Sequence, residues 1–225
     1  HVLLGVINDL LDLSKIEAGK IEIREEDFDL AQTVEDLVEM LRMKSREKGL
    51  SVSLELDPAA RLRVRTDLAK LRQILINLMG NAVKFTEKGG VSLRVRAAPA
   101  GDGDDRLFLF FGVEDTGVGI PGDMFGEVFE LFKQAQSKEG AVGTGLGLTI
   151  SRALARLMGG DIKLTSSLGK GSVFTFSLPV KKALEGAEPD EPDAALVDGL
   201  ASGQAEWRVL VAEDNLENMR LIESL

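Results

Sequence analysis

Two pairs of strand-like segments, each joined by a turn, constrain the fold of this chain more than any other feature. Residues 91–96 and 107–114 are strand-like on either side of the turn GDGDD, and residues 161–166 and 172–178 form a second pair. Strands joined so closely pair in antiparallel fashion. Because helical patterns separate the two pairs, the sequence predicts an α/β protein: a two-layer α/β sandwich with a mixed sheet, not a doubly wound parallel sheet.

The other expected elements fill residues 20–182, which we assign to one domain. Apolar residues at helical spacing predict helices over 29–48, ending at Gly49, over 68–85, with Asp67 as the N-cap, and over 146–158. Alternating patterns predict short strands over 21–24, 51–56 and 61–65.

The two ends of the chain differ from this domain. Residues 1–19 carry one apolar stripe and predict one long helix, whose stripe should pair with another helix in a hairpin or dimer; packing on the main domain is the alternative. Residues 183–206 are acidic, with Pro189 and Pro192, and predict a flexible linker. Residues 207–225 begin with the apolar run WRVLVA and predict the first strand and helix start of a truncated second domain.

Composition excludes several classes of protein. The 225 residues carry a net charge of −10, which argues against a nucleic-acid binder because phosphate attachment needs a basic face. The chain has no cysteine, and therefore no disulfide framework or thiolate metal site. It shows no long apolar run and no signal-peptide pattern, so we expect no membrane contact by this stretch and a cytoplasmic location, although the parent protein could still be membrane-anchored.

Three polar side chains share one face of the helix expected over 68–85. Asn77, Asn81 and Lys84 fall at i, i+4 and i+7. An amide oxygen can bind Mg²⁺, and an ammonium can meet a phosphate. The alternative is a solvated helix face without a ligand.

Two glycine-containing stretches carry the other candidate residues. Asp115 follows the apolar run LFLFFGV and opens the turn DTGVGI. A buried carboxylate there needs donors, which the exocyclic amine of a purine supplies, whereas an exposed one only bonds its own backbone. The stretch GTGLGLTI over 143–150 runs into a helix, where glycines either turn the chain or let backbone N–H groups approach a phosphate.

In order along the chain, NLMGNAVKF, DTGVGI, FELFKQ and GTGLGLTI resemble the N, G1, F and G2 boxes of the ATP-binding domain of sensor histidine kinases, which has the Bergerat-type fold. The likeness covers nearly all of residues 30–179. Residues 1–19 resemble the second helix of the dimerisation and phosphoacceptor hairpin in that family. WRVLVAEDN resembles the start of a receiver domain, which implies a hybrid kinase.

The resemblance implies a role for each matching residue, with ATP and Mg²⁺ as cofactors. Asn81 would bind Mg²⁺, Asn77 and Lys84 would act beside the phosphates as catalytic groups, and Asp115 would hold the adenine amino group. The pocket would also include Gly117, Gly119, Ile120, Phe132, Gly143, Thr144, Gly145, Leu146 and Gly147, with Phe129 packing beneath. Glu213 and Asp214 match the Mg²⁺-binding acids of a receiver, which residues 207–225 are too short to complete.

The resemblance also separates the possible reactions. Related hydrolases carry a glutamate one helical turn before the Mg²⁺-binding Asn, where this chain has Asn77, and a carboxamide cannot activate water. Phosphoryl transfer to a histidine is therefore expected. That histidine belongs to an upstream hairpin helix and is not His1, so the partners would be this hairpin, a second copy of the chain in a homodimer, and the downstream receiver. A non-catalytic regulatory or dimerisation module, or an ATPase of the same fold, remains the alternative.

Overall fold

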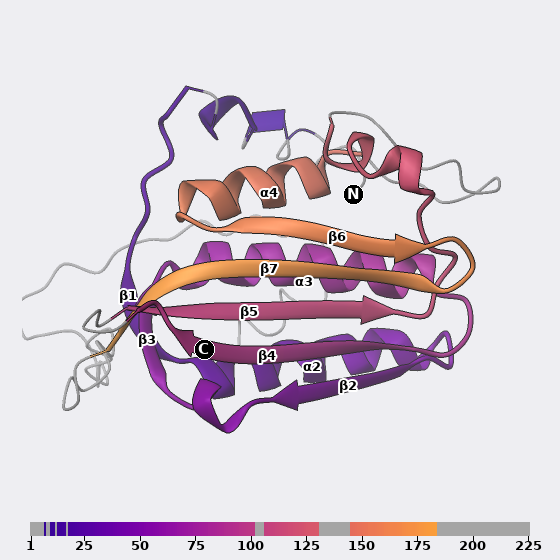
Figure 1. The fold of residues 1–225 in the computed structure, drawn as a ribbon, viewed down its shortest axis with the longest axis horizontal. Helices are drawn as coiled ribbons and strands as arrows, with labels where there is room; N and C mark the ends of the chain where they lie inside the picture. Colours follow the sequence, from indigo (N-terminus) through magenta and orange to yellow (C-terminus); the bar gives the residue numbers. More distant parts are fainter. Residues whose placement is uncertain are drawn as a thin grey trace, which may run out of the picture. The chain divides into compact units, whose positions relative to one another are not determined.

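A computed structural model of the chain describes residues 7, 10–11, 13–16, 18–101, 106–130 and 145–183. All of these residues belong to His1–Pro189, the first of two units into which the chain divides. The described strands form one seven-stranded sheet in the order β1-β3-β7-β5-β4-β2, with β6 also paired to β7 (Figure 1). Their bounds are β1 Glu26–Asp29, β2 Ser51–Leu56, β3 Arg63–Thr66, β4 Gly90–Pro99, β5 Arg106–Asp115, β6 Asp161–Ser167 and β7 Gly171–Lys182.

The pairing of these strands confirms the predicted mixed sheet. β4 and β5 are antiparallel, with Val91 opposite Asp115, and β6 and β7 are antiparallel, with Ile162 opposite Phe176. β2 lies parallel to β4 at one edge. The long strand β7 joins the two hairpins because it pairs with both β5 and β6.

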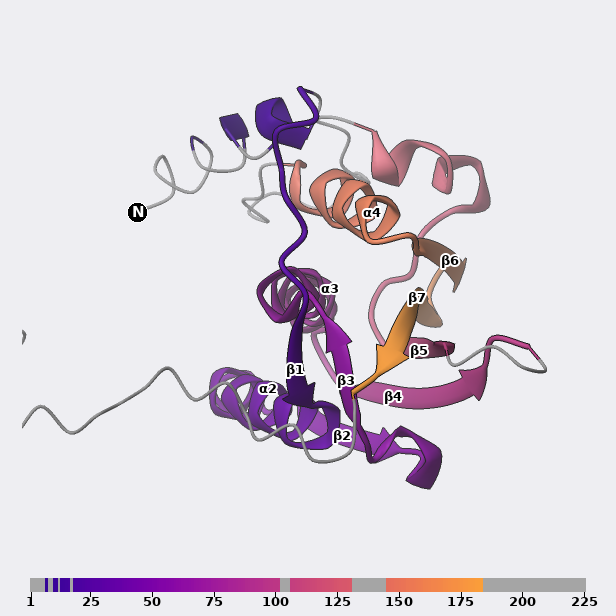
Figure 2. The same cartoon turned by 90° about the vertical axis from the view of Figure 1, so that its left-hand side faces the viewer.

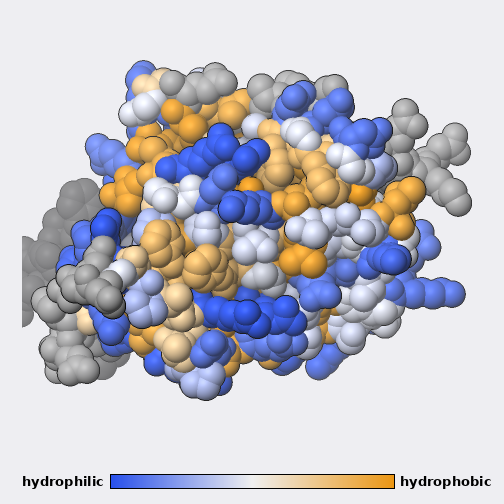
Figure 3. Space-filling view, in the orientation of Figure 1, coloured by the Kyte–Doolittle hydropathy of each residue, from blue (hydrophilic) through white to orange (hydrophobic). Residues whose placement is uncertain are grey.

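The helices α2 (Leu30–Arg46), α3 (Leu68–Phe85) and α4 (Gly147–Leu157) all cover one face of the sheet (Figure 2). Fully buried side chains fill the space between the two layers, among them Leu71, Ile74, Leu109, Phe111 and Phe176. The other face of the sheet mixes hydrophilic and hydrophobic side chains (Figure 3). This arrangement is the two-layer sandwich that the sequence predicts.

Capping side chains set where the first two of these helices begin. The carboxylate of Asp29 accepts a hydrogen bond from the Gln32 N–H at 2.9 Å, and that of Asp67 accepts one from the Lys70 N–H at 2.9 Å. The predicted helix over 68–85 is therefore confirmed to the residue. α4 begins differently, because its N-cap residue is Leu146, whose side chain has no hydrogen-bonding group.

Two strand predictions were displaced along the chain. The strand expected over 21–24 is wrong: the first strand is Glu26–Asp29, because the Arg24 N–H bonds the Asp67 carboxylate at 2.9 Å instead of a neighbouring strand. The strand expected over 61–65 begins at Arg63, since Asp57 caps a 3₁₀ turn, η1 (Pro58–Ala60), just before it.

The described residues of the first segment, 7, 10–11 and 13–16, are helical. Leu13 and Ile16 pack against the core of the domain, which is the alternative that the sequence left open. Ile7, Leu10 and Leu11 are instead exposed by 44%, 42% and 52%. The full length of this helix and residues 184–225, including the predicted linker and receiver start, lie outside the described residues. Among the helices described, none has the length and apolar content to cross a membrane.

Candidate functional site

Asp115 ends the central strand β5 between β4 and β7, and it is only 6% exposed. Its carboxylate accepts the Gly117 N–H at 2.8 Å and is also bonded by the Ser172 N–H. Burial raises the pKa of Asp115 above its ordinary value, and these two donors only partly offset that effect. The buried carboxylate is therefore short of donors, which is the condition for recognising a ligand N–H.

The turn after Asp115 lies tightly against two neighbouring elements. Gly119 has φ of +70°, and a Cβ there would collide with the Ser167 carbonyl at the end of β6. A Cβ at Gly117 would collide with the Phe85 carbonyl at the end of α3. The Ile120 N–H completes the turn by bonding the Ser166 hydroxyl at 2.8 Å. These glycines therefore allow the turn to pack closely against α3 and β6, which is a structural role independent of any ligand.

The predicted polar line on α3 is present. Asn77 donates its Nδ2 to the Ser151 hydroxyl on α4 at 2.8 Å, and Asn81 donates its Nδ2 to the Asn77 Oδ1 at 3.4 Å. This arrangement leaves the Asn81 Oδ1 without a hydrogen-bond partner among the described residues. A half-buried amide oxygen in that state fits the needs of a hard cation such as Mg²⁺.

Lys84 completes the line near the C-terminal end of α3. Its Nζ lies 4.9 Å from the centroid of the Phe85 ring. Burial lowers the pKa of Lys84, and the nearby Lys48 lowers it further. Lys48 itself donates to the carbonyls of Val83 and Lys84 at 3.0 and 3.2 Å, so it caps the end of α3.

Gly147, the first residue of α4, lies directly against the Asn77 side chain. A Cβ at this position would collide with the Asn77 Oδ1. The glycine therefore lets α4 begin beside Asn77, one of the two amides, Asn77 and Asn81, that form the amide line of α3. Helix N-termini favour anions because their first N–H groups and the helix dipole point outward.

The two halves of the site are joined by α3. At one end Asn77 meets Gly147 and Ser151, and at the other the Val118 N–H bonds the Phe85 carbonyl at 3.4 Å beside Asp115. From Asn77 to Phe85 the helix rises about 12 Å. In the roles that the resemblance implies, the Asp115 turn forms the base end of the site and the Asn77 region its phosphate end, with Asn81 and Lys84 between them along α3.

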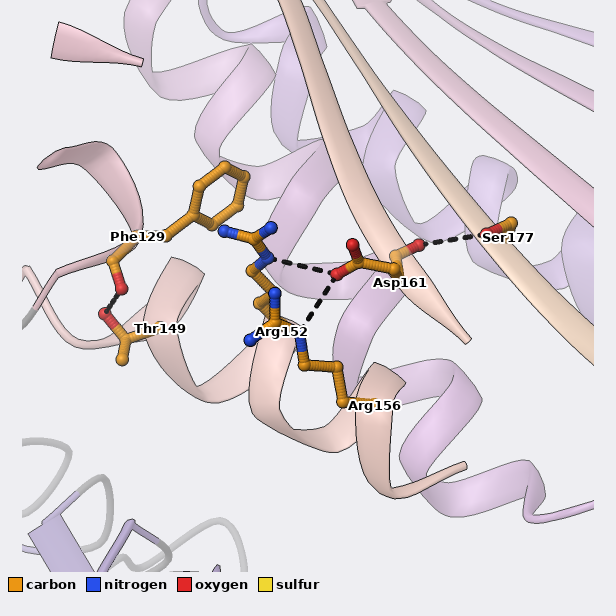
Figure 4. A network of polar contacts seen from close by, with 6 residues as sticks. All are labelled: Phe129, Thr149, Arg152, Arg156, Asp161 and Ser177. Carbon is orange, nitrogen blue, oxygen red and sulfur yellow. Dashed lines mark hydrogen bonds and ion pairs between the residues drawn. The ribbon is translucent and has the colours of Figure 1, made fainter. Parts of the chain in front are cut away.

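Part of the predicted site lies outside the described residues, namely Phe132, Gly143, Thr144, Glu213 and Asp214, together with His1. The turn just before that gap is described: η3 (Glu127–Phe129) places the Phe129 ring edge-on to Phe174, with 6.4 Å between the ring centroids. Its carbonyl accepts the Thr149 hydroxyl from α4 at 3.0 Å (Figure 4). Gly145, with φ of +69°, and the buried Leu146 lead into α4 after the gap.

Sequence reasoning missed Ser151, Ser172 and Lys48. Each contributes through a partner far away along the chain, and no local pattern marks such a contact. A groove of about 420 Å³ between α2 and β2, lined by Glu35, Val38, Arg42, Leu54, Leu56 and Arg61, contains none of the predicted site residues.

The two-layer sandwich, the buried Asp115 and the polar line of α3 are together the features expected of an ATP-binding domain. Residues 66–182 match the family described as "Histidine kinase-, DNA gyrase B-, and HSP90-like ATPase", and the chain belongs to this family. The chain is 39% identical to the aerobic respiration control sensor protein ArcB of Escherichia coli K12, over 97% of this chain and 28% of that protein. It is also 39% identical to hybrid signal transduction histidine kinase B of Dictyostelium discoideum, over 80% of this chain and 9% of that protein.

A solved structure of a related protein has the same fold. Full-length ShkA in complex with AMPPNP superposes with a TM-score of 0.69 at 35% identity, covering 80% of this chain and 36% of that one. The chain thus spans less than a third of the curated relatives named above. The likeness shows that this chain contains an ATP-binding domain of this family.

Proposed function

We propose that this chain is the ATP-binding catalytic part of a hybrid two-component sensor histidine kinase, which transfers the γ-phosphoryl group of ATP to a histidine. The observation that carries the proposal is Asp115, a buried carboxylate short of donors at the end of β5, whose following turn packs against the C-terminal end of α3. The four ordered motifs and the sensor-kinase relatives support the same function.

Each part of Mg²⁺–ATP has a candidate partner. Asp115 would accept the adenine amino group, while the Asn81 Oδ1 would bind Mg²⁺ and Lys84 would meet the phosphates. Burial and the nearby Lys48 lower the pKa of Lys84, and a phosphate bound there would favour its charged form. Mg²⁺ would offset charge on the transferring phosphate when bound.

Asn77 favours transfer to a protein side chain over hydrolysis. Its Nδ2 is bonded to Ser151 and its Oδ1 accepts from Asn81, so the amide is held in place by both helices. A carboxamide does not take a proton near neutral pH and cannot act as a general base toward water. In the proposed reaction Asn77 positions groups, and the acceptor histidine supplies the nucleophile.

The remaining partners follow from the family. The acceptor would lie on a hairpin helix upstream of residue 1, two copies would pair through that hairpin, and residues 207–225 would begin a receiver with Glu213 and Asp214 as its first acids. The exposed Ile7, Leu10 and Leu11 are consistent with a helix that lacks such a partner.

Two measurements test the function in sequence. Titration of the chain with Mg²⁺ and AMPPNP should show saturable binding, which Asp115→Asn abolishes while the fold persists. Supplying a histidine-bearing hairpin in trans, with ATP, should then yield acid-labile phosphate on the hairpin. An absence of binding by the unmodified chain would refute the enzyme, and binding followed by steady release of inorganic phosphate without a phosphorylated hairpin would identify an ATPase instead.

A further inference from the structure

A network of side chains joins α4 to the turn that ends at Phe129. Arg152 donates its Nε to the Asp161 carboxylate at 3.0 Å, and its guanidinium carbon lies 4.5 Å from the centroid of the Phe129 ring (Figure 4). Thr149, one turn earlier on the same face of α4, donates its hydroxyl to the Phe129 carbonyl at 3.0 Å. Phe129 is thus held through both its ring and its backbone.

Asp161 anchors this network to the sheet. It is the first residue of β6, and its carbonyl accepts the Ser177 hydroxyl on β7 at 3.3 Å. The hydrogen bond from Arg152 is the main cause of the lowered pKa of Asp161, so the carboxylate is charged at neutral pH. The guanidinium is therefore fixed between a charged carboxylate and an aromatic face, a position that suits its planar shape.

The neighbouring Arg156 provides an internal comparison. It bonds the same oxygen of Asp161 at 3.3 Å, from one turn further along α4. Its side chain is 59% exposed, against 30% for Arg152. The cation–π contact to Phe129 is made by Arg152. Two arginines thus share one carboxylate, and Arg152 also holds the turn.

The position of Phe129 in the chain explains why its contact with Arg152 matters for the site. Phe129 is the last residue but one before residues 131–144, which lie outside the described residues, and α4 begins shortly after them at Gly147. The same helix meets Asn77 of the phosphate end through Gly147 and Ser151. One short helix therefore fixes both the amide line and the turn.

We infer that Arg152 is a positioning residue for the phosphate end of the nucleotide site, acting through Phe129. The inference rests on the proposed ATP-binding function. Arg152 does not serve the base end, because Asp115 and its turn are held by β7, β6 and α3 through other contacts. Its loss should weaken binding of the triphosphate and leave recognition of the base unchanged.

The test compares two ligands across matched variants of the full chain. Arg152→Met, which keeps length and removes charge, should bind Mg²⁺–AMPPNP about 3- to 10-fold more weakly, the range that a partly buried cation–π contact supports. Its affinity for adenosine, measured by NMR titration, should stay within about twofold of the unmodified chain. Arg156→Met should change neither affinity, and Arg152→Lys should restore part of the AMPPNP affinity.

A double-substitution cycle identifies the path through Phe129. Phe129→Leu should produce a loss of AMPPNP affinity similar to that of Arg152→Met, and the double variant should lose no more than the larger of the two. Melting temperatures recorded alongside will show that each variant is folded. Equal losses for AMPPNP and adenosine, or an equal loss in Arg156→Met, would show a general structural role and overturn the inference.

Failure of this inference is distinguishable from failure of the proposed function. If the unmodified chain binds AMPPNP and Arg152→Met binds it equally well, Arg152 has no positioning role while the nucleotide site stands. If the unmodified chain does not bind AMPPNP, both are refuted.

Discussion

At the scale of single residues, the site depends on close contacts that the side-chain types alone do not reveal. The sequence correctly placed Asn77, Asn81 and Lys84 on one helical face and Asp115 at the end of a buried strand. It could not show that Ser151 holds Asn77, because these residues meet only when α3 packs on α4. The roles of these residues toward a nucleotide stay predictions.

Gly147 should be intolerant of a side chain. In Gly147→Ala the new methyl group would push the Asn77 amide away from its place, so we expect Mg²⁺–AMPPNP affinity to fall at least about tenfold, since small displacements in a site are costly. Gly80→Ala is the matched control, because a Cβ there meets nothing within 4 Å. It should leave affinity unchanged and raise the free energy of unfolding by about 0.5–1 kcal/mol. Calorimetric titration measures the affinity, and urea denaturation measures the free energy of unfolding. Undiminished binding by Gly147→Ala would contradict the prediction.

Asp115 should cost the unliganded fold some stability. Because burial raises its pKa, the folded protein binds the proton more tightly than the unfolded chain, so stability falls as pH rises from the ordinary aspartate range through the raised pKa. At any pH above that pKa, the ionised Asp115 lowers the stability of the fold by the full amount. Asp115→Asn should therefore be more stable than the unmodified chain at about pH 7, with the difference shrinking toward about pH 4. Urea denaturation at several pH values measures this, and a less stable variant at neutral pH would refute it.

At the scale of elements, local signals predicted the helices well and the short strands poorly. α3 was predicted to the residue because an apolar face and a capping Asp67 agree on its limits. β1 was misplaced because its four residues, EDFD, carry almost no apolar alternation and form a strand only by pairing with β3. The parallel pairing of β2 with β4 likewise depends on the packing of α2 and α3 rather than on a local pattern.

The cap of α3 should be the element-level interaction whose loss costs most. The Asp67 carboxylate, 2% exposed, bonds the Lys70 and Arg24 N–H groups and the Lys70 Nζ at 2.6 Å. Asp67→Ala should lower the free energy of unfolding by about 2–3 kcal/mol, since a cap and buried donors are lost together. Asp57→Ala, which uncaps only the short turn η1, should cost less than about 1 kcal/mol. Equal losses in the two variants would contradict this account.

The same interaction has a predictable dependence on pH. Burial alone would raise the pKa of Asp67, but the bonds from Lys70 and Arg24 outweigh it and lower the pKa. Its contribution is therefore present above the pKa of an unfolded aspartate and is lost as pH falls through the lower folded value. The difference in stability between Asp67→Ala and the unmodified chain should accordingly diminish below about pH 4.

At the scale of the whole molecule, the order of elements was enough to predict the fold class. Two antiparallel hairpins interleaved with helices rule out a doubly wound parallel sheet, and helices with one apolar face bury that face against the sheet. What the order could not supply is the strand sequence across the sheet, in which β7 joins β5, β6 and β3. That arrangement brings Ser172 opposite Asp115 and so places a second N–H donor beside the Asp115 carboxylate.

The whole-molecule prediction is that the domain ending with β7 suffices for nucleotide binding. The described site residues lie between Asn77 and Ser172, and the last described residue, Ala183, donates its N–H to the Arg63 carbonyl at 3.1 Å. A chain ending at Ala183 should therefore unfold in one cooperative transition and bind Mg²⁺–AMPPNP within about twofold of the full chain. Ending it at Pro179 instead removes Lys181 and Lys182, which pair with β3, and should lower the melting temperature. A large loss of affinity in the chain ending at Ala183 would mean that residues 184–225 contribute to the site.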